Sequence, residues 1–289
     1  MQVQGPTLLQ GACEGIARRS CGHEKLREFM SAPFDGQKLS FVRPRKQQRI
    51  VAIPATPQPV ELDLSATALV VVDMQNDFLH PDGWFAKKGV DGTAVKAVIP
   101  SVKRLVEASR AAGMPVIWLN WGVRADRANL PATTVAKGRA FGSPTYSDPS
   151  PSGRGRILVT GDWGAATIDE LPMDPADILV HKHRLSGFWD NELDSVLRRR
   201  GVTALMFAGI NIDRCVFSTL QDANFLGYDC LLVEDACATV SPQFVTDAVL
   251  YLVRLLHGAV ASSDAILSAI GMPDSSPRLS AQTPDRSAT

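Results

Sequence analysis

Apolar runs and helical repeats alternate along most of the chain. Continuous apolar stretches predict strands at residues 69–73, 115–119, 178–182, 204–210, 228–233 and 259–261. Apolar residues at helical spacing predict helices at residues 96–112, 165–171, 191–200, 215–226 and 242–256. The β-branched and unbroken character of the first strand indicates burial on both of its faces. The alternation therefore predicts an α/β fold in which helices cover both faces of a central, mostly parallel sheet.

A cysteine stands where such a fold places reactive groups. The strand predicted at 204–210 is followed by a short polar turn, and Cys215 then opens the next helical pattern. A thiol at the start of a helix lies at the positive end of the helix dipole, which favours the thiolate. Free backbone N–H groups at the same place can hold an oxyanion. Cys215 is therefore a candidate nucleophile, although a single Cys is often only a small core residue.

Two further polar residues end predicted strands. Asp73 closes the strand at 69–73, and Lys182 closes the strand at 178–182. Taken alone, Asp73 would suit a turn cap and Lys182 a solvated strand end. A parallel sheet, however, brings its carboxyl ends to one edge, where α/β proteins build their sites. There Asp73 can accept the thiol proton of Cys215, and Lys182 can stabilise both negative groups.

These residues also carry a family resemblance. Residues 71–78 around Asp73, 182–188 around Lys182 and 209–216 around Cys215 resemble the isochorismatase-like cysteine hydrolases. The resemblance covers roughly residues 49–267. Residues 53–64, 161–163 and 193–201 are most similar to the ureidoacrylate amidohydrolases of that family. Those enzymes carry Ala where this chain has Asn211 and Glu where it has Phe217.

The resemblance implies both a fold and a mechanism. The fold is a Rossmann-like three-layer sandwich, and the catalytic residues are Asp73, Lys182 and Cys215. The backbone N–H groups of Cys215 and Asn211 are the expected oxyanion donors, and the Ile210–Asn211 peptide bond is expected to be cis. The implied reaction cleaves a C–N bond of a small amide, ureide or carbamoyl compound through a thioester.

A wider set of residues is expected around the substrate. Candidates for the pocket are Gln75, Phe78, Asn120, Trp121, Trp163, Arg184, Phe188 and Phe217. The long connection at residues 122–155 is predicted to be a lid or a subunit contact. Its Phe141 and Tyr146 are the residues expected to close over a substrate.

Three alternative functions start from the same fold. Isochorismatases that hydrolyse vinyl ethers lack a cysteine at the position of Cys215. Nicotinamidases add a metal site with an Asp-x-His pattern after the second strand, and residues 119–123 contain no His. We therefore expect neither a metal nor another cofactor. A non-catalytic binding protein is the third alternative, and the three clustered polar residues argue against it.

Composition limits the partners and the compartment. The chain has 30 Lys and Arg against 30 Asp and Glu, so no net charge attracts it to nucleic acid or to an anionic membrane. No apolar stretch approaches the ~20 residues that span a bilayer. Five Cys form no paired framework, which favours a reducing cytoplasm. We expect a homo-oligomer, a dimer or a tetramer, whose substrate is a small molecule.

The ends of the chain differ from its middle. Residues 1–49 form a basic, acid-poor arm, predicted to be flexible or to pack on a neighbouring subunit. Its run at residues 43–49 is basic enough to consider nucleic acid, but a solvated arm is the preferred interpretation. Residues 50–271 form the predicted hydrolase domain, and the polar, Pro- and Ser-rich residues 272–289 are predicted to be a disordered tail.

Overall fold

The computed structural model describes residues 46–139 and 143–271. The predicted tail at 272–289 and Phe141 lie outside the described residues, as does the predicted arm except for residues 46–49. Two of those four residues contact the domain: the Lys46 ammonium donates to the carbonyls of Ser65 at 3.1 Å and Arg200 at 2.8 Å, and the Arg49 amide donates to Asp63 Oδ1 at 2.9 Å.

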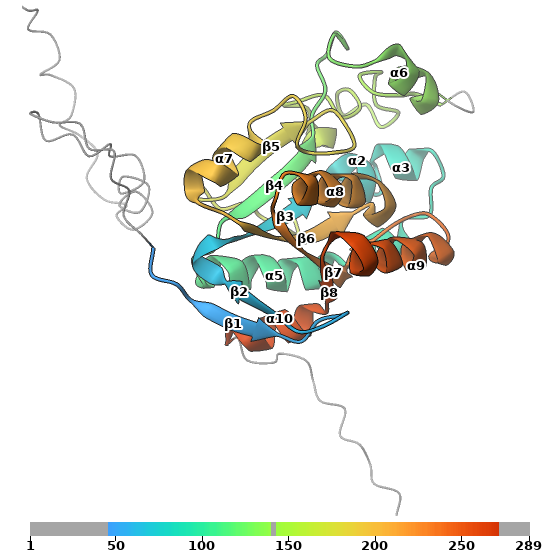
Figure 1. Ribbon diagram of the computed structural model, residues 1–289. Coiled ribbons are helices and arrows are strands. Elements are labelled where there is room, and N and C mark those ends of the chain that lie inside the picture. Colours follow the sequence, from blue (N-terminus) through green and yellow to red (C-terminus); the bar gives the residue numbers. More distant parts are fainter. Residues whose placement is uncertain (1–45, 140–142, 272–289) are drawn as a thin grey trace, which may run out of the picture. The chain divides into compact units, whose positions relative to one another are not determined.

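A six-stranded sheet forms the centre of the domain, in the order β5-β4-β3-β6-β7-β8 (Figure 1). All of its neighbouring pairs are parallel, which confirms the predicted sheet. The strands are β3 (Thr67–Val72), β4 (Val116–Trp121), β5 (Ile178–Lys182), β6 (Ala204–Ile210), β7 (Asp229–Ala238) and β8 (Ala259–Ala261). An antiparallel hairpin of β1 (Ile50–Ile53) and β2 (Val60–Asp63), which the sequence analysis missed, precedes them.

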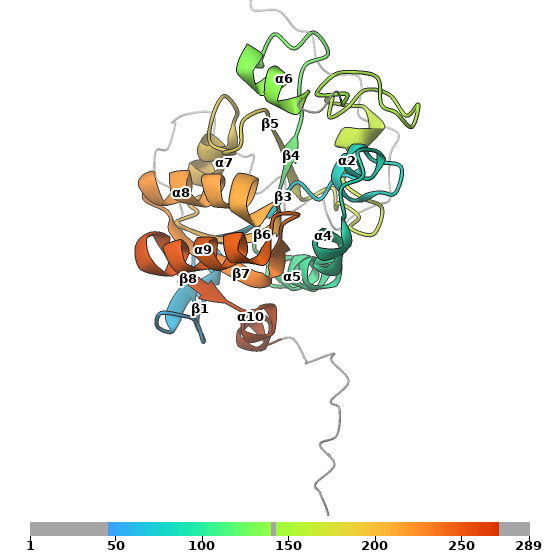
Figure 2. The ribbon, with the colours of Figure 1, turned by 90° about the vertical axis from the view of Figure 1, so that its right-hand side faces the viewer.

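Helices cover both faces of this sheet (Figures 1 and 2). α5 (Ile99–Ala111) and α10 (Ser263–Ile270) lie on one face, and α7 (Leu193–Arg200), α8 (Phe217–Phe225) and α9 (Gln243–Leu252) lie on the other. Shorter helices are α2 (Asn76–Leu79), α3 (Trp84–Lys87), α4 (Thr93–Ala97) and α6 (Ala132–Gly138). The three-layer arrangement follows because the central strands are apolar on both faces, so each face needs a helical cover.

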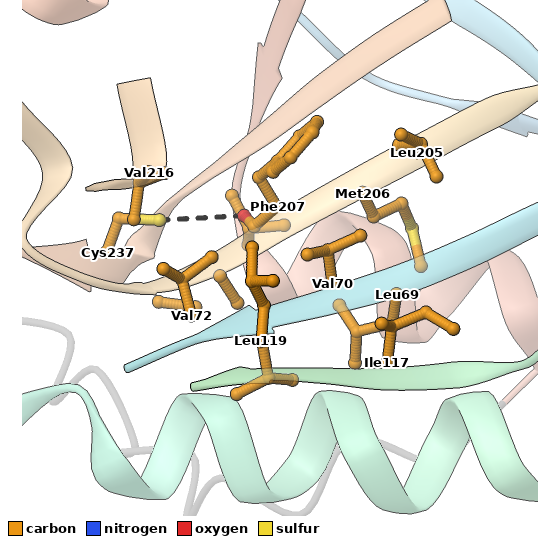
Figure 3. Close-up of a cluster of buried hydrophobic side chains, with 14 of the residues drawn as sticks. Leu69, Val70, Val72, Ile117, Leu119, Leu205, Met206, Phe207, Val216 and Cys237 are labelled. Atoms are coloured by element: carbon orange, nitrogen blue, oxygen red, sulfur yellow. Dashed lines mark hydrogen bonds between the residues drawn. The ribbon is translucent and has the colours of Figure 1, made fainter. Parts of the chain in front are cut away.

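The core lies where these layers meet (Figure 3). Every residue of β3, β4 and β6 is buried, so these strands offer water no face. In Figure 3 side chains from the three strands gather in one cluster, which includes Leu69, Leu119 and Phe207. Such continuous burial favours branched apolar residues and explains why the sequence predicted these strands well.

Several predicted elements are wrong in detail. The helix predicted at 165–171 is absent: a short 3-10 turn, η3 (Trp163–Ala165), is followed by a bridge at Thr167 and a turn at residues 169–170. There the Ile168 amide donates to the Met74 carbonyl at 3.0 Å, and the Asn76 amide donates to the Ala166 carbonyl at 3.0 Å. These long-range bonds replace the local bonds of a helix.

The bounds of two helices and one strand also differ from those predicted. The helix predicted to open at Cys215 begins earlier, with the π-helical turn η4 (Ile212–Val216), and α8 follows it. α9 ends at Leu252 and continues as a second π-turn, η5 (Val253–His257). β7 runs beyond the predicted 228–233, to Ala238.

None of the helices in the part of the chain that the structure describes is both long and apolar enough to cross a membrane.

Gly209 offers a test of the close packing between β6 and β3. Its φ of +113° suits glycine, and a Cβ added there would lie 2.2 Å from the Val72 carbonyl oxygen. We expect Gly209→Ala to lower the free energy of unfolding by at least about 3 kcal/mol, because left-handed strain and a backbone overlap add together. Urea unfolding measures the change.

Gly227 supplies the matched control. It also has a positive φ, +89°, but an added Cβ would meet nothing within 4 Å. Gly227→Ala should therefore cost only about 1 kcal/mol, the strain alone. Equal losses in the two variants would contradict the proposed steric origin.

Candidate active site

The strand order reverses between β3 and β6, and the predicted site lies at that point. From β3 the chain continues outward to β4 and β5, whereas β6 leads to β7 and β8 on the other side. Ligand sites of open α/β sheets lie at the carboxyl ends of the strands beside such a reversal. Asp73 directly follows β3, Lys182 ends β5, and Cys215 lies in η4 after β6. The structure brings these three predicted residues together.

Asp73 is the centre of the cluster. Its carboxylate is buried, with Oδ2 3.0 Å from the Lys182 ammonium and Oδ1 accepting the Trp121 backbone N–H at 3.1 Å. The Cys215 thiol lies near enough for the negative charge of this carboxylate to raise its pKa. A carboxylate placed in this way can exchange a proton with the thiol while it remains paired with a cation.

Lys182 is fully buried, which excludes the alternative of a solvated strand end. Its Nζ lies 4.2 Å from the centre of the Trp121 ring and donates to the Arg184 carbonyl at 3.3 Å. A buried ammonium is tolerated only when an opposite charge and hydrogen-bond acceptors surround it. Asp73, the Trp121 ring face and this carbonyl supply those surroundings.

Cys215 is held as a neutral thiol. Burial raises its pKa to about 12, and the negative charge of Asp73 contributes in the same direction. Burial therefore outweighs the effect that the helix dipole is expected to have on this thiol. The Trp121 Nε1–H donates to Sγ at 3.3 Å and lowers the cost of a negative sulfur.

Asp73 has a shifted pKa of its own. Burial raises the pKa of the carboxyl, and the Lys182 charge opposes this rise. Moving the proton from Cys215 to Asp73 leaves the total charge of the site unchanged. The thiolate can then form beside Lys182 without any exchange of protons with water.

Asn211 supports the segment that carries Cys215. The Ile210–Asn211 peptide bond is cis, as the resemblance implied. The Asn211 carbonyl accepts the amides of Arg214 at 3.1 Å and Val216 at 3.2 Å, and its side-chain Oδ1 accepts the Val240 amide at 3.2 Å. The side chain thus ties the η4 turn to the end of β7.

Tyr146 is brought to the cluster by the long connection after β4. Its ring stacks on Trp121 with centroids 5.2 Å apart. Burial raises the pKa of its phenol, and the charges of Cys215 and Asp73 add to the rise. Arg127 donates to the Tyr146 carbonyl at 2.9 Å and so holds the loop in place. Of the two residues expected to close over a substrate, Tyr146 lies at the cluster, and Phe141 is outside the described residues.

Gln75 and Asn120, two predicted pocket residues, serve other contacts. The Gln75 side chain donates to the carbonyls of Trp121 at 2.8 Å and Ala165 at 2.7 Å, and accepts the Trp121 amide at 2.8 Å. Both polar atoms of the Gln75 side chain are therefore bonded to backbone groups. Asn120 lies on the face of β4 opposite Trp121, donates to Thr167 at 2.9 Å, and lines a separate cavity of about 420 Å³.

The other predicted pocket side chains each have protein partners. Phe78 packs against Phe85, Phe188 against Tyr228, and Phe217 against His257, with ring centroids 4.8, 5.7 and 5.7 Å apart. The Arg184 guanidinium lies 3.1 Å from the Asp190 carboxylate. No sequence signal indicated these pairings, because they join side chains from different elements.

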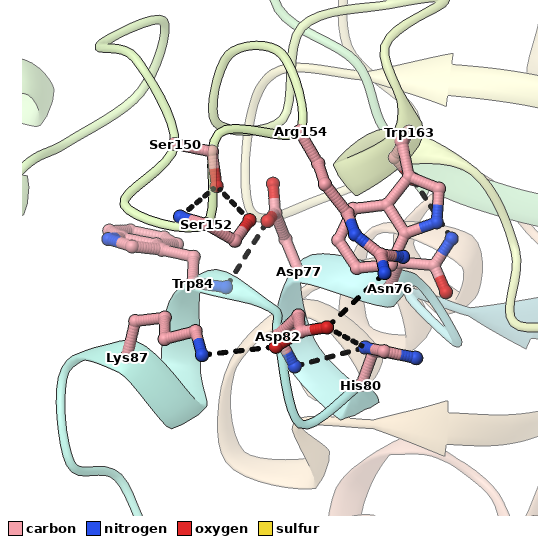
Figure 4. A network of polar contacts seen from close by, with 10 residues as sticks. All are labelled: Asn76, Asp77, His80, Asp82, Trp84, Lys87, Ser150, Ser152, Arg154 and Trp163. Atoms are coloured by element: carbon pink, nitrogen blue, oxygen red, sulfur yellow. Dashed lines mark hydrogen bonds and ion pairs between the residues drawn. The ribbon is translucent and has the colours of Figure 1, made fainter.

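Trp163, the remaining candidate, belongs to a surface network (Figure 4). The Arg154 guanidinium lies 4.5 Å from the centre of its ring and 3.3 Å from the Asp82 carboxylate. The His80 ring meets Trp163 edge to face at 4.9 Å. This network fastens the loop around Arg154 to the segment after α2.

Across residues 46–139 and 143–271, no three His, Cys, Asp or Glu side chains gather in an arrangement that could hold a metal ion. The last two residues of β4, Asn120 and Trp121, are not common metal ligands.

Known proteins resemble this chain in sequence and in structure. Its residues 67–265 match the isochorismatase domain model. The chain is 37% identical over 230 residues to the ureidoacrylate amidohydrolase RutB of Rhizobium rhizogenes, which covers 77% of this chain and 90% of that protein. The relatives are named as amidohydrolases, in agreement with the predicted class of enzyme.

Solved structures share the fold. A cysteine hydrolase from Pseudomonas syringae superposes with a TM-score of 0.62 at 24% identity, over 78% of this chain and 98% of that one. N-carbamoylsarcosine amidase from Thermoplasma acidophilum gives a TM-score of 0.53 at 29% identity, over 68% of this chain and 96% of that one. With the family domain matched over most of its length, the chain belongs to the isochorismatase family.

Proposed function

We propose that the chain is a cysteine-dependent amidohydrolase that cleaves a C–N bond of a small linear amide, ureide or carbamoyl compound through a thioester. The observation that carries the proposal is the buried Asp73–Lys182 ion pair beside the Cys215 thiol. The amidohydrolase relatives and the N-carbamoylsarcosine amidase neighbour support the substrate class.

The proposed first half-reaction forms the thioester. The Cys215 proton moves to Asp73 while the sulfur attacks the carbonyl carbon, and Lys182 keeps the site near neutrality. The tetrahedral intermediate then expels the amine, which takes the proton from Asp73. In the second half-reaction Asp73 accepts a proton from water, the hydroxide attacks the thioester, and Cys215 regains its proton as the acid leaves.

Backbone groups are the proposed oxyanion donors. The N–H groups of Cys215 and Asn211 belong to the turn that presents the sulfur. Donors fixed in a water-poor site stabilise developing charge strongly, since they need not reorient during the reaction. The bonds of Asn211 to Val240, Arg214 and Val216 support the rigidity that this role requires.

Trp121 and Tyr146 are the proposed walls of the substrate pocket. Trp121 contacts the sulfur through its indole N–H, and Tyr146 stacks against the same ring. Flat aromatic walls suit a planar amide or ureide, and a half-buried phenol can bond to one of its polar atoms. The proposed reaction uses neither a metal nor another cofactor. Its proposed substrate is a small molecule, and its proposed location is the cytoplasm.

Vinyl-ether hydrolysis and simple binding are the competing functions. Neither uses a sulfur nucleophile, so Cys215 separates them from the proposal. A panel of small amides, ureides and carbamates, assayed for ammonia release, tests the reaction class. Mass spectrometry of quenched turnovers should find the acyl group on the Cys215 peptide, whereas a binding protein or a vinyl-ether hydrolase would show none.

We expect Cys215→Ala to lower kcat/KM for the best substrate of the panel by more than about 10³, because the nucleophile is lost. Cys230→Ala is the matched control: Cys230 is also a buried thiol but donates to the Leu220 carbonyl, away from the cluster. Near wild-type turnover in Cys215→Ala would overturn the covalent mechanism.

Lys182→Ala should be nearly as damaging as loss of the nucleophile. It leaves the single negative charge that Asp73 and Cys215 share with no cation beside it in a buried site, so the site takes up a second proton and the reactive pair is lost. Lys182→Arg should restore little, because a planar guanidinium does not replace a compact ammonium at 3.0 Å from Asp73. Steady-state rates decide the point, and a Lys182→Ala rate within a small factor of wild type would remove Lys182 from the mechanism.

The pH profile of kcat/KM follows from the two shifted groups. The reaction needs one proton shared by Asp73 and Cys215. At low pH Asp73 is protonated while Cys215 keeps its own proton, so the pair holds two protons and activity is lost. Burial raises the pKa of Asp73, which places this acid limb above the ordinary Asp value of about 3.9.

The alkaline limb is set by the thiol. With the pKa of Cys215 raised to about 12, no loss should occur near the ordinary thiol value of about 8.5. In Lys182→Ala the acid limb should move to higher pH, since the charge that lowers the pKa of Asp73 is gone. An alkaline limb near pH 8.5 in the wild type would show that the thiol ionises independently of Asp73.

A further inference from the structure

Gln75 is a buried amide whose bonds converge on one residue of the site. It is 0% exposed. Its Nε2 donates to the carbonyls of Trp121 at 2.8 Å and Ala165 at 2.7 Å, and its Oε1 accepts the Trp121 amide at 2.8 Å. Both N–H groups of the amide and its oxygen therefore have partners, as burial requires. Two of the three bonds go to the backbone of Trp121.

The Gln75 amide takes the place of a strand that has ended. β3 pairs with β4 as far as Val72 and Leu119, and the Asp73 amide then donates to the Leu119 carbonyl at 2.9 Å. In a parallel ladder the next groups of β4 to face β3 are the N–H and C=O of Trp121. The Asp73 carbonyl that would continue the ladder instead accepts the Gln75 amide at 2.8 Å. The side chain of Gln75 supplies the donor and the acceptor that β3 no longer offers.

Trp121 connects this amide to the catalytic cluster. Its backbone N–H lies 2.8 Å from Gln75 Oε1 and 3.1 Å from Asp73 Oδ1, so the two oxygens share one donor. Its indole N–H donates to Cys215 Sγ at 3.3 Å, and the centre of its ring lies 4.2 Å from the Lys182 ammonium. A shift of the Trp121 backbone would therefore change all three contacts together.

Gln75 is itself held by a second segment. Its backbone forms an antiparallel bridge with Thr167, and its side chain bonds to the carbonyl of Ala165 in the same stretch of chain. A side chain fixed in this way can hold Trp121 at one position. A displacement of about 1 Å near a reacting group can lower a rate by about 100-fold, so such a restraint matters for catalysis.

We propose that Gln75 is a positioning residue: its side-chain amide fixes the backbone of Trp121 and, through Trp121, the arrangement of Asp73, Lys182 and Cys215. The inference rests on the proposed function, because the arrangement that it explains is that of the proposed hydrolysis. A neutral amide is needed at this position, since a carboxylate would lie beside Asp73 and accept the same N–H.

Gln75→Glu is the main test, because its behaviour should depend on pH. A protonated Glu keeps an acceptor for the Trp121 N–H and one O–H donor for a carbonyl, whereas an ionised Glu has no donor and repels Asp73. Burial and the charge of Asp73 both raise the pKa of the new carboxyl above the ordinary Glu value of about 4.3. Lys182 keeps Asp73 ionised, so the new carboxyl retains its proton to higher pH. We expect kcat/KM for the best substrate of the panel to fall at least about 10-fold as pH rises through this pKa, where the wild type is flat.

Gln75→Met removes every polar atom at similar size and should lower kcat/KM by about 100-fold at all pH values. A second readout needs no substrate: the indole N–H signal of Trp121 in proton–nitrogen correlation spectra, identified by its loss in Trp121→Phe. This signal should shift in Gln75→Met, because the bond to Cys215 Sγ changes. In Gln75→Glu it should move over the same pH range as kcat/KM.

Asn76 provides the matched control. It is the neighbouring buried amide, 4% exposed, and it donates to the Trp163 carbonyl at 2.9 Å instead of bonding Trp121. Asn76→Asp and Asn76→Leu should lower the thermal stability but leave the pH profile and the Trp121 signal as in the wild type. If Gln75→Met does not fold, the pH dependence of Gln75→Glu decides the point.

Three results would overturn the proposal. They are a Gln75→Met rate within a small factor of wild type, a Gln75→Glu profile parallel to that of the wild type, and equal effects of the Asn76 variants on the Trp121 signal. A wild-type protein that turns over no substrate would instead contradict the proposed hydrolysis. A Trp121 signal that still moves in the Gln75 variants would then support the positioning of Trp121 by Gln75.

Discussion

The buried ion pair between Asp73 and Lys182 is the interaction on which the site depends. Two charges removed from water are tolerated only at close range and with their remaining bonds satisfied. The 3.0 Å contact meets the first condition. The Trp121 amide and the Arg184 carbonyl meet the second in part, because Asp73 Oδ2 has no hydrogen-bond partner among the described residues. Because the pair is neutral as a whole, a thiol can lie beside it without adding charge, and its proton can move within the site. The reactivity proposed for Cys215 comes from this neutrality.

The sheet topology makes that pair possible. Asp73 and Lys182 are far apart in sequence and come from β3 and β5, with β4 between them. Trp121, at the end of β4, therefore contacts the carboxylate through its backbone N–H, the ammonium through its ring face and the sulfur through its indole N–H. One residue of the middle strand thus contacts all three groups. Gln75 holds the backbone of that residue from both sides, which gives a buried amide a role in positioning that the sequence did not reveal.

The sequence predicted what local pattern and strand order determine. The strands at 178–182 and 204–210 were found with their observed bounds, because unbroken apolar runs end there at polar residues. The common edge of Asp73, Lys182 and Cys215 followed from parallel strands. The helix at 165–171 failed because Ile168 bonds to Met74, a contact no local pattern records. The contacts of Gln75, Asn120 and Trp163 also join distant segments, and the sequence left open whether the loop that carries Tyr146 is a lid or a subunit contact.

The state of the thiol shows most clearly what a pattern leaves out. A cysteine at the start of a helix predicts a lowered pKa, since the dipole acts over one turn and is visible in the sequence. Burial acts in the opposite direction and depends on the complete surroundings, which here raise the pKa to about 12. A thiol that stays protonated is protected from alkylation and oxidation, because the thiolate is the reactive form. In the proposed mechanism the sulfur becomes nucleophilic only when its proton moves to Asp73, so the same burial that suppresses side reactions restricts attack to a substrate already in place beside the stacked rings of Trp121 and Tyr146.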